Sequence, residues 1–132
     1  MDSKDEKIIE ILKENGRASF TEIAEEVGVS EGTVRNRVEG MKDEGVVEKF
    51  TVEVNEENNI ESFVSVTVST DRNFEEILKD MPEEIEVYEL AGDIDILAKI
   101  SAKTSQQLNS KDDEIRKIEG VKDTNTYMVL SN

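Results

Sequence analysis

The sequence is 132 residues long and strongly acidic, with 32 Asp and Glu against 16 Lys and Arg and a net charge of −16. It contains neither Cys nor His, which excludes disulfides, thiolate metal sites and histidine-based catalytic triads. No apolar run approaches the ~20 residues of a membrane helix. We therefore expect a cytoplasmic protein with no cofactor and no membrane span.

The first 45 residues carry start and stop signals for three short helices. Capping boxes, in which side chains satisfy backbone N–H groups of the first turn, are predicted at Ser3–Glu6 and Ser19–Glu22. Ser30 can cap a third helix alone, and apolar residues follow each cap at helical spacing. Glycines favour left-handed caps at the three helix ends, at Gly16, Gly28 and Gly45.

After the third helix the apolar period changes to two. Phe50, Val52 and Val54 alternate with polar residues, which predicts a strand or wing. The polar stretch Asn55–Asn59 is the best candidate linker. The expected boundaries are 1–52 for a helical domain, 53–61 for a linker and 62–132 for a second domain.

The second domain alternates between strand and helix patterns. The expected elements are a strand at Val64–Val68, a helix at Phe74–Met81, strands at Ile85–Leu90 and Ile94–Ile100, a helix carrying Leu108, Ile115 and Ile118, and a strand at Val121–Leu130. Asn73 and Thr104 are candidate caps for the two helices. The order βαββαβ is the ferredoxin-like plan. The fold class is therefore α+β, with a winged helical domain first.

The segment Phe20–Met41 has the features of a helix-turn-helix, with Gly28 at its sharp turn. Because Val34, Val38 and Met41 must face the core, the other side of the last helix faces outward. Arg and Asn can make bidentate hydrogen bonds to guanine and adenine edges in the major groove. The alternative is a three-helix packing unit with solvated charges. The candidate DNA-binding residues are Ser30, Gly32, Thr33, Arg35, Asn36 and Arg37.

This stretch, followed by Asp43–Val47, resembles the DNA-binding domain of the leucine-responsive/asparagine-responsive (Lrp/AsnC) family of prokaryotic regulators. The remainder resembles that family's effector domain, of the RAM type, at Ala91–Leu97, Leu108–Val121 and Thr124–Leu130. The resemblance covers nearly the whole chain. It implies an archaeal transcriptional regulator, not an enzyme, that binds double-stranded DNA, responds to an amino acid or related small molecule, and assembles as dimers, tetramers or octamers.

The acidity leaves two other functions open. Residues 1–52 hold 8 Lys and Arg against 13 Asp and Glu, and 8 − 13 gives a net charge of −5, so a protein of this architecture can lose DNA binding and modulate a partner instead. Sirohaem decarboxylases share the architecture but act with His, which this chain lacks. The acidity itself fits a concentrated-salt cytoplasm or an ordinary soluble surface.

The turn at Gly92–Asp95 is the candidate small-molecule site. Gly allows close backbone approach, free amides in such a turn can hold a carboxylate, and Asp can pair with an ammonium group. Hydroxyls on the last strand could add contacts from an adjoining subunit. The alternatives are ordinary hairpin residues and β-propensity. The candidate effector-binding residues are Gly92, Asp93, Asp95, Thr124 and Thr126.

The remaining carboxylates do not form a metal-binding pattern. Asp112–Glu114 lies on a predicted helix and is interpreted as a solvated face. Asp93 and Asp95 could hold a hard cation weakly, but no twelve-residue calcium loop is present. We therefore expect no metal site.

The expected sheet has two helices on one face and leaves the other bare. Leu97, Tyr88 and Leu90 are out of phase with the inward-facing residues of their strands. Exposed apolar side chains on a bare sheet face usually mark an interface. The minimum unit is therefore expected to be a dimer.

Overall fold

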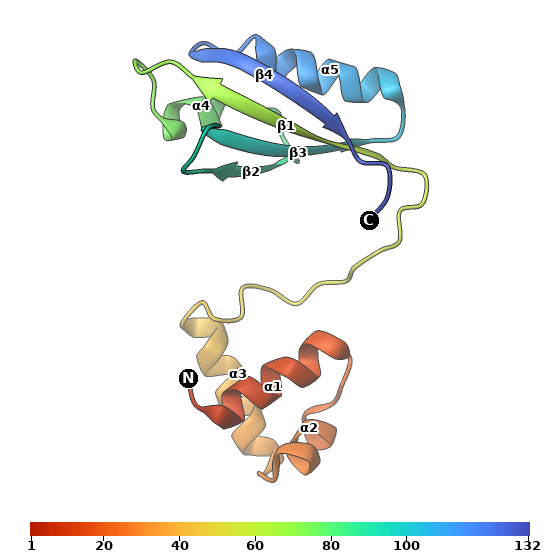
Figure 1. Ribbon diagram of the computed structural model, residues 1–132. Coiled ribbons are helices and arrows are strands. Elements are labelled where there is room, and N and C mark those ends of the chain that lie inside the picture. The colour runs from red at the N-terminus through yellow and green to blue at the C-terminus, as the bar shows by residue number, and fades with distance from the viewer. The chain divides into compact units, whose positions relative to one another are not determined.

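The computed structural model describes all 132 residues, and they divide into two units. The first unit is Met1–Asn55 and the second is Glu56–Asn132. The first unit contains three helices, and the second contains a four-stranded sheet with two helices; Figure 1 labels these elements. The expected α+β class, a helix-turn-helix unit followed by βαββαβ, is confirmed.

The first unit consists of α1 (Ser3–Glu14), α2 (Phe20–Val27) and α3 (Glu31–Asp43). Ser19 and Ser30 cap α2 and α3 as expected, since each hydroxyl oxygen accepts a hydrogen bond from the backbone N–H three residues on, at 3.1 Å in both cases. Gly28 lies between these helices with a φ of 81°. That left-handed conformation favours glycine and allows the tight turn from α2 into α3.

The first helix begins and ends differently from expectation. Asp2, not Ser3, caps α1: its carboxylate accepts from the N–H of Asp5 at 2.9 Å, and the Asp5 carboxylate accepts from the N–H of Asp2 at 3.3 Å. A carboxylate caps as well as a hydroxyl does and also complements the helix dipole. Gly16 is not left-handed, because α1 ends on Asn15 in an extended conformation.

A small core holds the three helices together, made of Ile8, Ile23, Ala24, Val34, Val38 and Met41. The last three lie on α3, as their spacing predicted. Burying an aliphatic side chain of this size stabilises the fold by ~1.5–3 kcal/mol. The inward row on α3 therefore fixes which side of that helix faces solvent.

The strand or wing expected after α3 is not formed. Residues 46–59 form neither helix nor strand, and the side chains of Phe50, Val52 and Val54 are 53%, 78% and 69% exposed. Their alternation is a β pattern, but a strand needs a hydrogen-bonded neighbour. No other segment of the chain pairs with this one.

The second unit contains β1 (Ile60–Val68), α4 (Phe74–Asp80), β2 (Glu86–Glu89), β3 (Ile96–Ala102), α5 (Ser105–Arg116) and β4 (Val121–Met128). The sheet order is β2-β3-β1-β4, with every pair antiparallel. β1 begins at Ile60, within the segment expected to be linker, because Ile60 and Glu61 pair with Ala102 and Ser101 of β3. Asn73 and Thr104 cap α4 and α5 as expected.

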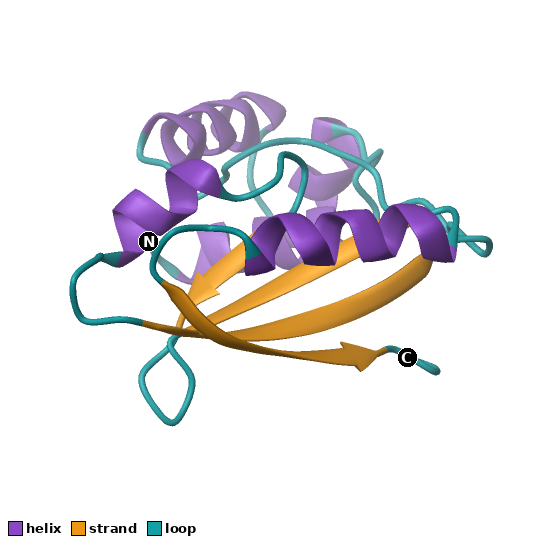
Figure 2. Ribbon diagram, turned by 90° about the horizontal axis from the view of Figure 1, so that it is seen from above, coloured by secondary structure: helices purple, strands orange, loops and turns teal.

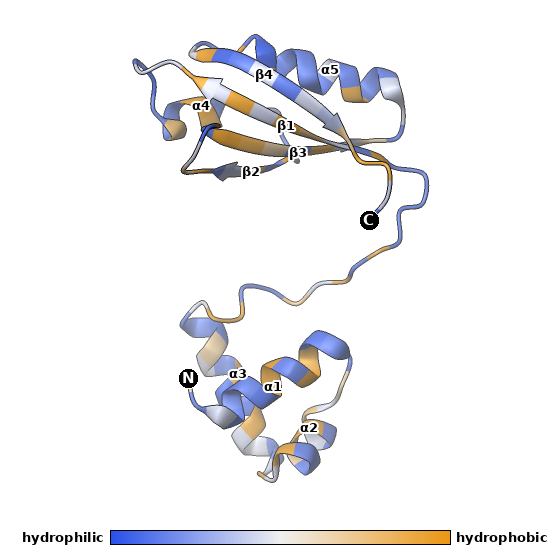
Figure 3. Cartoon of the chain, in the orientation of Figure 1, coloured by the Kyte–Doolittle hydropathy of each residue, from blue (hydrophilic) through white to orange (hydrophobic).

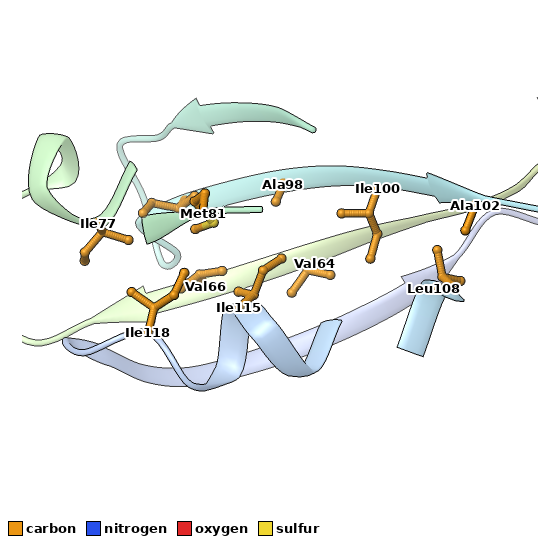
Figure 4. Packing of buried hydrophobic residues seen from close by; sticks show 11 residues of the cluster. Val64, Val66, Ile77, Met81, Ala98, Ile100, Ala102, Leu108, Ile115 and Ile118 are labelled. Atoms are coloured by element: carbon orange, nitrogen blue, oxygen red, sulfur yellow. The ribbon is translucent and has the colours of Figure 1, made fainter. Parts of the chain in front are cut away.

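Both helices of this unit pack on one face of the sheet. Figures 1 and 2 show α5 running along that face, and Figure 4 shows Val64 and Ile100 of the sheet beside Leu108 and Ile115 of α5. α4 contributes Ile77 to the same core. In Figure 3, β3 is largely apolar while the visible surface of α5 is mostly hydrophilic.

No helix covers the opposite face of the sheet. Phe63 pairs with Tyr127 across β1 and β4, and Tyr88 pairs with Leu97 across β2 and β3, so these four side chains share that face. The two tyrosines are more than half exposed. The expected apolar residues on a bare face are therefore present in the single chain.

Arg72 joins three parts of the second unit. Its guanidinium donates to the backbone oxygens of Glu119, at 2.6 Å, and Glu76, at 3.0 Å, and pairs with the Asp80 carboxylate at 3.0 Å. Gly120, with a φ of 96°, lies against it so closely that a Cβ there would be 2.8 Å from the Arg72 Cδ. The arginine therefore links α4 to the turn before β4.

Candidate functional site

The outward side of α3 is the first candidate surface. Gly32, Arg35 and Asn36 are exposed, while Thr33 and Arg37 are half-buried at its edges. The side chain of Asn36 makes no hydrogen bond within the chain, so its amide is free for a ligand. The first two turns of α3 therefore present polar groups to solvent while its apolar side is buried.

Arg35 contacts two residues that were not among the site residues predicted from the sequence. Its guanidinium forms an ion pair with Glu31, one turn earlier on α3, and lies 5.8 Å from the centre of the Phe20 ring at the start of α2. Glutamate four residues before arginine is a recognisable helical pairing signal. The contact with Phe20 depends on how α2 and α3 pack, and the sequence carries no direct signal for it.

Arg37 points away from Arg35 and ties α3 to α1. Its Nη1 lies 2.6 Å from the Asp2 carboxylate and 3.1 Å from that of Asp5. The hydrogen bond from the Asp5 N–H, followed by that from Arg37, lowers the pKa of Asp2 to about 2. Hydrogen bonds to the two carboxylates raise the pKa of Arg37. Arg37 is thus part of the scaffold that positions α3.

Two hydroxyls at the start of α3 also have structural partners. The Ser30 hydroxyl accepts from the N–H of Thr33, and the two hydroxyl oxygens lie 2.8 Å apart. They satisfy the helix cap, but both remain close to the free N–H groups of the first turn. That end of a helix favours anions such as phosphate.

Carboxylates share the outward side of α3. Gly32, Asn36, Glu39 and Asp43 follow one another at helical spacing, and all four are exposed. The surface that carries Asn36 is therefore not uniformly basic. Attraction to a polyanion has to come from local groups rather than from net charge.

The second candidate surface is the loop between β2 and β3. The N–H of Leu90 donates to the backbone oxygen of Asp95 at 2.9 Å, which closes the loop. Gly92 has a φ of 145°, and both Gly92 and Asp93 are exposed. The Asp95 carboxylate is already engaged, because it accepts the N–H of Val68 at 2.9 Å. Asp93 is thus the freer of the two candidate acidic groups.

Thr124 and Thr126 do not join this loop within one chain. They lie on β4, opposite Val66 and Val64 of β1, on the sheet face that the helices cover. Because β1 separates β4 from β3 and neighbouring strands are ~4.8 Å apart, the loop and the threonines sit on different strands roughly 10 Å apart. One chain therefore does not bring all five candidate effector residues together.

The threonines contact α5 instead. The Thr126 hydroxyl donates to the Asp112 carboxylate at 2.8 Å, and Nε of Arg116 donates to Thr124 at 3.3 Å. Arg116 also pairs with Asp112 at 3.0 Å. A shallow pocket of about 380 Å³ beside this network is lined by Arg116, Val121, Lys122, Asp123 and Thr124.

Asp112 corrects the interpretation of Asp112–Glu114 as a solvated face. Asp112 is only 6% exposed, because its position on α5 turns it toward β4, whereas Asp113 and Glu114 are exposed. A helix of this length can bury one polar position when partners are available. Here Arg116 and Thr126 are those partners, both for Oδ2, while Oδ1 is buried without a hydrogen bond.

The structure contains no group of three acidic, His or Cys residues that could hold a metal ion. No helix has both the length and the apolarity needed to cross a membrane. The candidate functional surfaces remain the outward side of α3 and the loop between β2 and β3.

Two family models together match almost the whole chain. Residues 1–42 match the AsnC-type helix-turn-helix domain, and residues 44–132 match the Lrp/AsnC ligand binding domain. Among curated proteins, the chain is 39% identical to the HTH-type transcriptional regulator FL11 of Pyrococcus furiosus, over 98% of this chain and 89% of the relative. It is also 39% identical to the HTH-type transcriptional regulator LysM of Saccharolobus solfataricus, over 98% and 94%.

Solved structures give the same match. AsnC of E. coli superimposes with a TM-score of 0.87 and 26% identity, over 100% of this chain and 93% of that one. A transcriptional regulator of Neisseria meningitidis, solved as an L-Met complex, superimposes with a TM-score of 0.85 at 24% identity, over 100% and 91%. At that identity the second likeness concerns the fold alone.

Proposed function

Because the chain belongs to the Lrp/AsnC family of DNA-binding transcriptional regulators, which are not enzymes, we propose that α3 reads operator DNA mainly through Arg35 and Asn36. The observation that carries this proposal is the placement of both side chains on the solvent side of α3, opposite its buried row. A guanidinium can bond guanine and a carboxamide can bond adenine with two hydrogen bonds each. The other family domain, at residues 44–132, binds a ligand.

The remaining candidates on α3 divide by their contacts. Ser30, Gly32 and Thr33 lie at its first turn, where N–H groups and hydroxyls favour a phosphate and Gly32 lets the backbone come close. Arg37 acts through its ion pairs with α1. Arg37, a candidate DNA-binding residue from the sequence, is therefore proposed to support α3 rather than to contact DNA.

The test begins by selecting bound duplexes from random DNA with the full-length protein. Substitutions Arg35→Ala and Asn36→Ala should each weaken binding to the selected operator by ~1–3 kcal/mol, the range of a bidentate base contact. Binding to scrambled duplexes should change much less. Operator binding by Arg35→Ala at wild-type affinity would rule out the proposed role.

For the ligand, we propose an amino acid bound at the Gly92–Asp95 loop. Exposed backbone groups around Gly92 suit a carboxylate, and Asp93 suits an ammonium group because it has no partner in the chain. Thr124 and Thr126 join such a site only if another subunit supplies them, since in one chain they lie on β4 against α5.

Calorimetric titration with the common amino acids, L-Met among them, tests the effector site. Asp93→Asn should weaken binding of the amino acid that the wild-type protein takes, and Asp95→Asn should also disturb the Val68 contact. Retained affinity in Asp93→Asn would place the ammonium group elsewhere. No binding of any amino acid to the wild-type protein would leave the loop as structure alone.

We further propose that the bare sheet face makes the protein at least a dimer, with tetramers or octamers built from dimers, in the cytoplasm where it meets DNA. Phe63 with Tyr127 and Tyr88 with Leu97 form two apolar pairs on that face, next to Lys99 and Ser65. Exposed apolar groups of this kind usually mark interfaces. Sedimentation should give a dimer or larger species at micromolar concentration, and a monomer would exclude this assembly.

A second candidate, a regulator that has lost DNA binding and acts on a partner, is favoured by one observation. Arg35 and Arg37 are both paired with carboxylates of their own unit, so their charge is partly neutralised. Electrophoretic shifts on upstream DNA at low and high potassium distinguish the two. A shift under either condition supports the operator-binding proposal, and its absence under both supports the alternative.

A further inference from the structure

Arg35 contacts both an aromatic ring and a carboxylate of its own unit. Its guanidinium lies over the Phe20 ring and forms an ion pair with Glu31 of its own helix. The Arg35 side chain is still 60% exposed and that of Glu31 is 38% exposed. The pair therefore sits at the surface that would meet DNA.

We infer that Glu31 and Phe20 are positioning residues for Arg35, and that Glu31 improves discrimination between operator and other DNA. The inference rests on the proposed role of Arg35. Neither Glu31 nor Phe20 is among the DNA-binding residues predicted from the sequence.

The contacts of Arg35 with Glu31 and Phe20 restrict its conformational freedom. A long arginine side chain loses rotamer freedom when it docks against a base edge. An ion pair from the preceding helical turn and a ring beneath the guanidinium restrict Arg35 before DNA arrives. Because a guanidinium carries five N–H donors, one can remain with Glu31 while others bond guanine.

Glu31 also repels the phosphates of DNA. Glu31 lies in the first turn of α3, where a phosphate would approach the free N–H groups. Its carboxylate repels every DNA backbone, whatever the sequence. Only DNA that offers Arg35 a matching base edge compensates for that repulsion, so Glu31 penalises non-specific binding more than operator binding. Specificity commonly arises from such a repulsive element.

Arg37 differs on each of these points. Two carboxylates from α1 hold it, and its side chain is only 31% exposed. Unlike Arg35, it makes no cation–π contact with an aromatic ring. Positioning for base recognition is therefore assigned to the Arg35 cluster alone.

Glu31→Gln tests the inference, and Glu39→Gln is the matched control. Both substitutions remove one negative charge from the exposed surface of α3, but only Glu31 forms an ion pair with Arg35. Dissociation constants would be measured for the selected operator and a scrambled duplex at several potassium concentrations. Thermal melting would confirm that each variant is folded.

We expect Glu31→Gln to tighten binding to scrambled DNA but not to the operator, so that the ratio of the two affinities falls about fivefold, the lower end of what one bidentate contact discriminates. Glu39→Gln should tighten both and leave the ratio unchanged. In an Arg35→Ala background the effect of Glu31→Gln on the ratio should disappear, since coupling requires both partners.

Phe20 is tested by a pair of substitutions that both keep an apolar side chain. Phe20→Leu removes the ring under Arg35 and should lower the operator-to-scrambled ratio, whereas Phe20→Tyr keeps the ring and should retain it. Equal ratios for the two variants, whether high or low, would contradict a positioning role of the ring. A merely structural role would move melting temperature without moving the ratio.

The outcomes separate this inference from the function on which it rests. If Arg35→Ala binds the operator normally, the proposed role of Arg35 fails. If Arg35→Ala loses the operator but Glu31→Gln behaves like Glu39→Gln, the role of Arg35 stands and the positioning role of Glu31 is wrong.

Discussion

The two units differ in how their candidate functional residues relate to their cores. In the first unit, Arg35 and Asn36 lie on the solvent side of a helix whose opposite side is buried. In the second, Thr126 and Asp95 are bonded into the scaffold, to α5 and to β1. Polar residues on a strand can therefore serve the fold as readily as a ligand, and their spacing alone does not separate the two uses.

The largest expected effect tests whether the two units are separate structures. Ile115 is fully buried between α5 and the sheet. The substitution Ile115→Ala should lower the free energy of unfolding by ~2–5 kcal/mol. Because the core of the first unit shares no residue with that of the second, amide hydrogen exchange should accelerate in residues 56–132 and stay unchanged in α1 to α3. Ile23→Ala should give the reverse pattern, and a uniform response to either variant would contradict separate cores.

A smaller loss is expected at the turn before β4. Gly120→Ala places a side chain at a φ of 96° and 2.8 Å from the Arg72 side chain. Strain of this kind costs ~1–3 kcal/mol. Chemical denaturation should show the loss, and Gly32→Ala, at a helical glycine with open space around it, is the contrasting variant. Equal losses for both would show that neither the positive φ of Gly120 nor its contact with Arg72 makes this substitution costly.

The threonines of β4 sharpen the comparison between scaffold and ligand contacts. Thr126→Val removes the hydrogen bond to Asp112 and should lower stability by ~1 kcal/mol or more, because a buried carboxylate loses a donor. If Thr126 serves only the fold, calorimetric affinity for the effector stays at the wild-type value. A weakened affinity with unchanged stability would return Thr126 to the effector site.

The smallest effect concerns the ion pairs of α1 and α3. The folded pKa of Asp2 is lowered from 3.8 to about 2, so its stabilising contribution is complete above its unfolded pKa and is lost as the pH falls toward 2. The melting temperatures of wild type and Asp2→Asn should differ slightly at pH 6 and converge near pH 2. Glu10→Gln, which changes an exposed carboxylate on α1, is the control and should show a smaller pH-dependent difference.

The sequence predicted the fold well because helix caps and apolar spacing are local signals. Ser19, Ser30, Asn73 and Thr104 all cap the helices that their spacing indicated. At α1 the prediction missed by one residue, since Asp2 and Ser3 are both acceptable caps. The prediction of a strand at 50–54 was wrong. Alternation of apolar and polar residues is a property of a single segment and does not show whether a neighbouring strand pairs with it.

The candidate sites were predictable to different degrees. The outward side of α3 follows from Val34 and Val38 alone, because a helix with a known inward row has a known outward row. On β4 the face of Thr124 depends on which side α5 packs, and that is a tertiary property. The Phe20 contact with Arg35 likewise depends on the angle between two helices, for which no local pattern exists.

The irregular segment between the units has an evolutionary consequence. Residues 48–54 belong to no helix or strand, and neither core includes them. A genetic crossover within this stretch would join either unit to a different companion without disturbing any packed interior. A single recombination event could thus combine the DNA-binding unit with a different ligand-binding unit. A crossover inside β1 would instead disrupt the pairing of β1 with both β3 and β4.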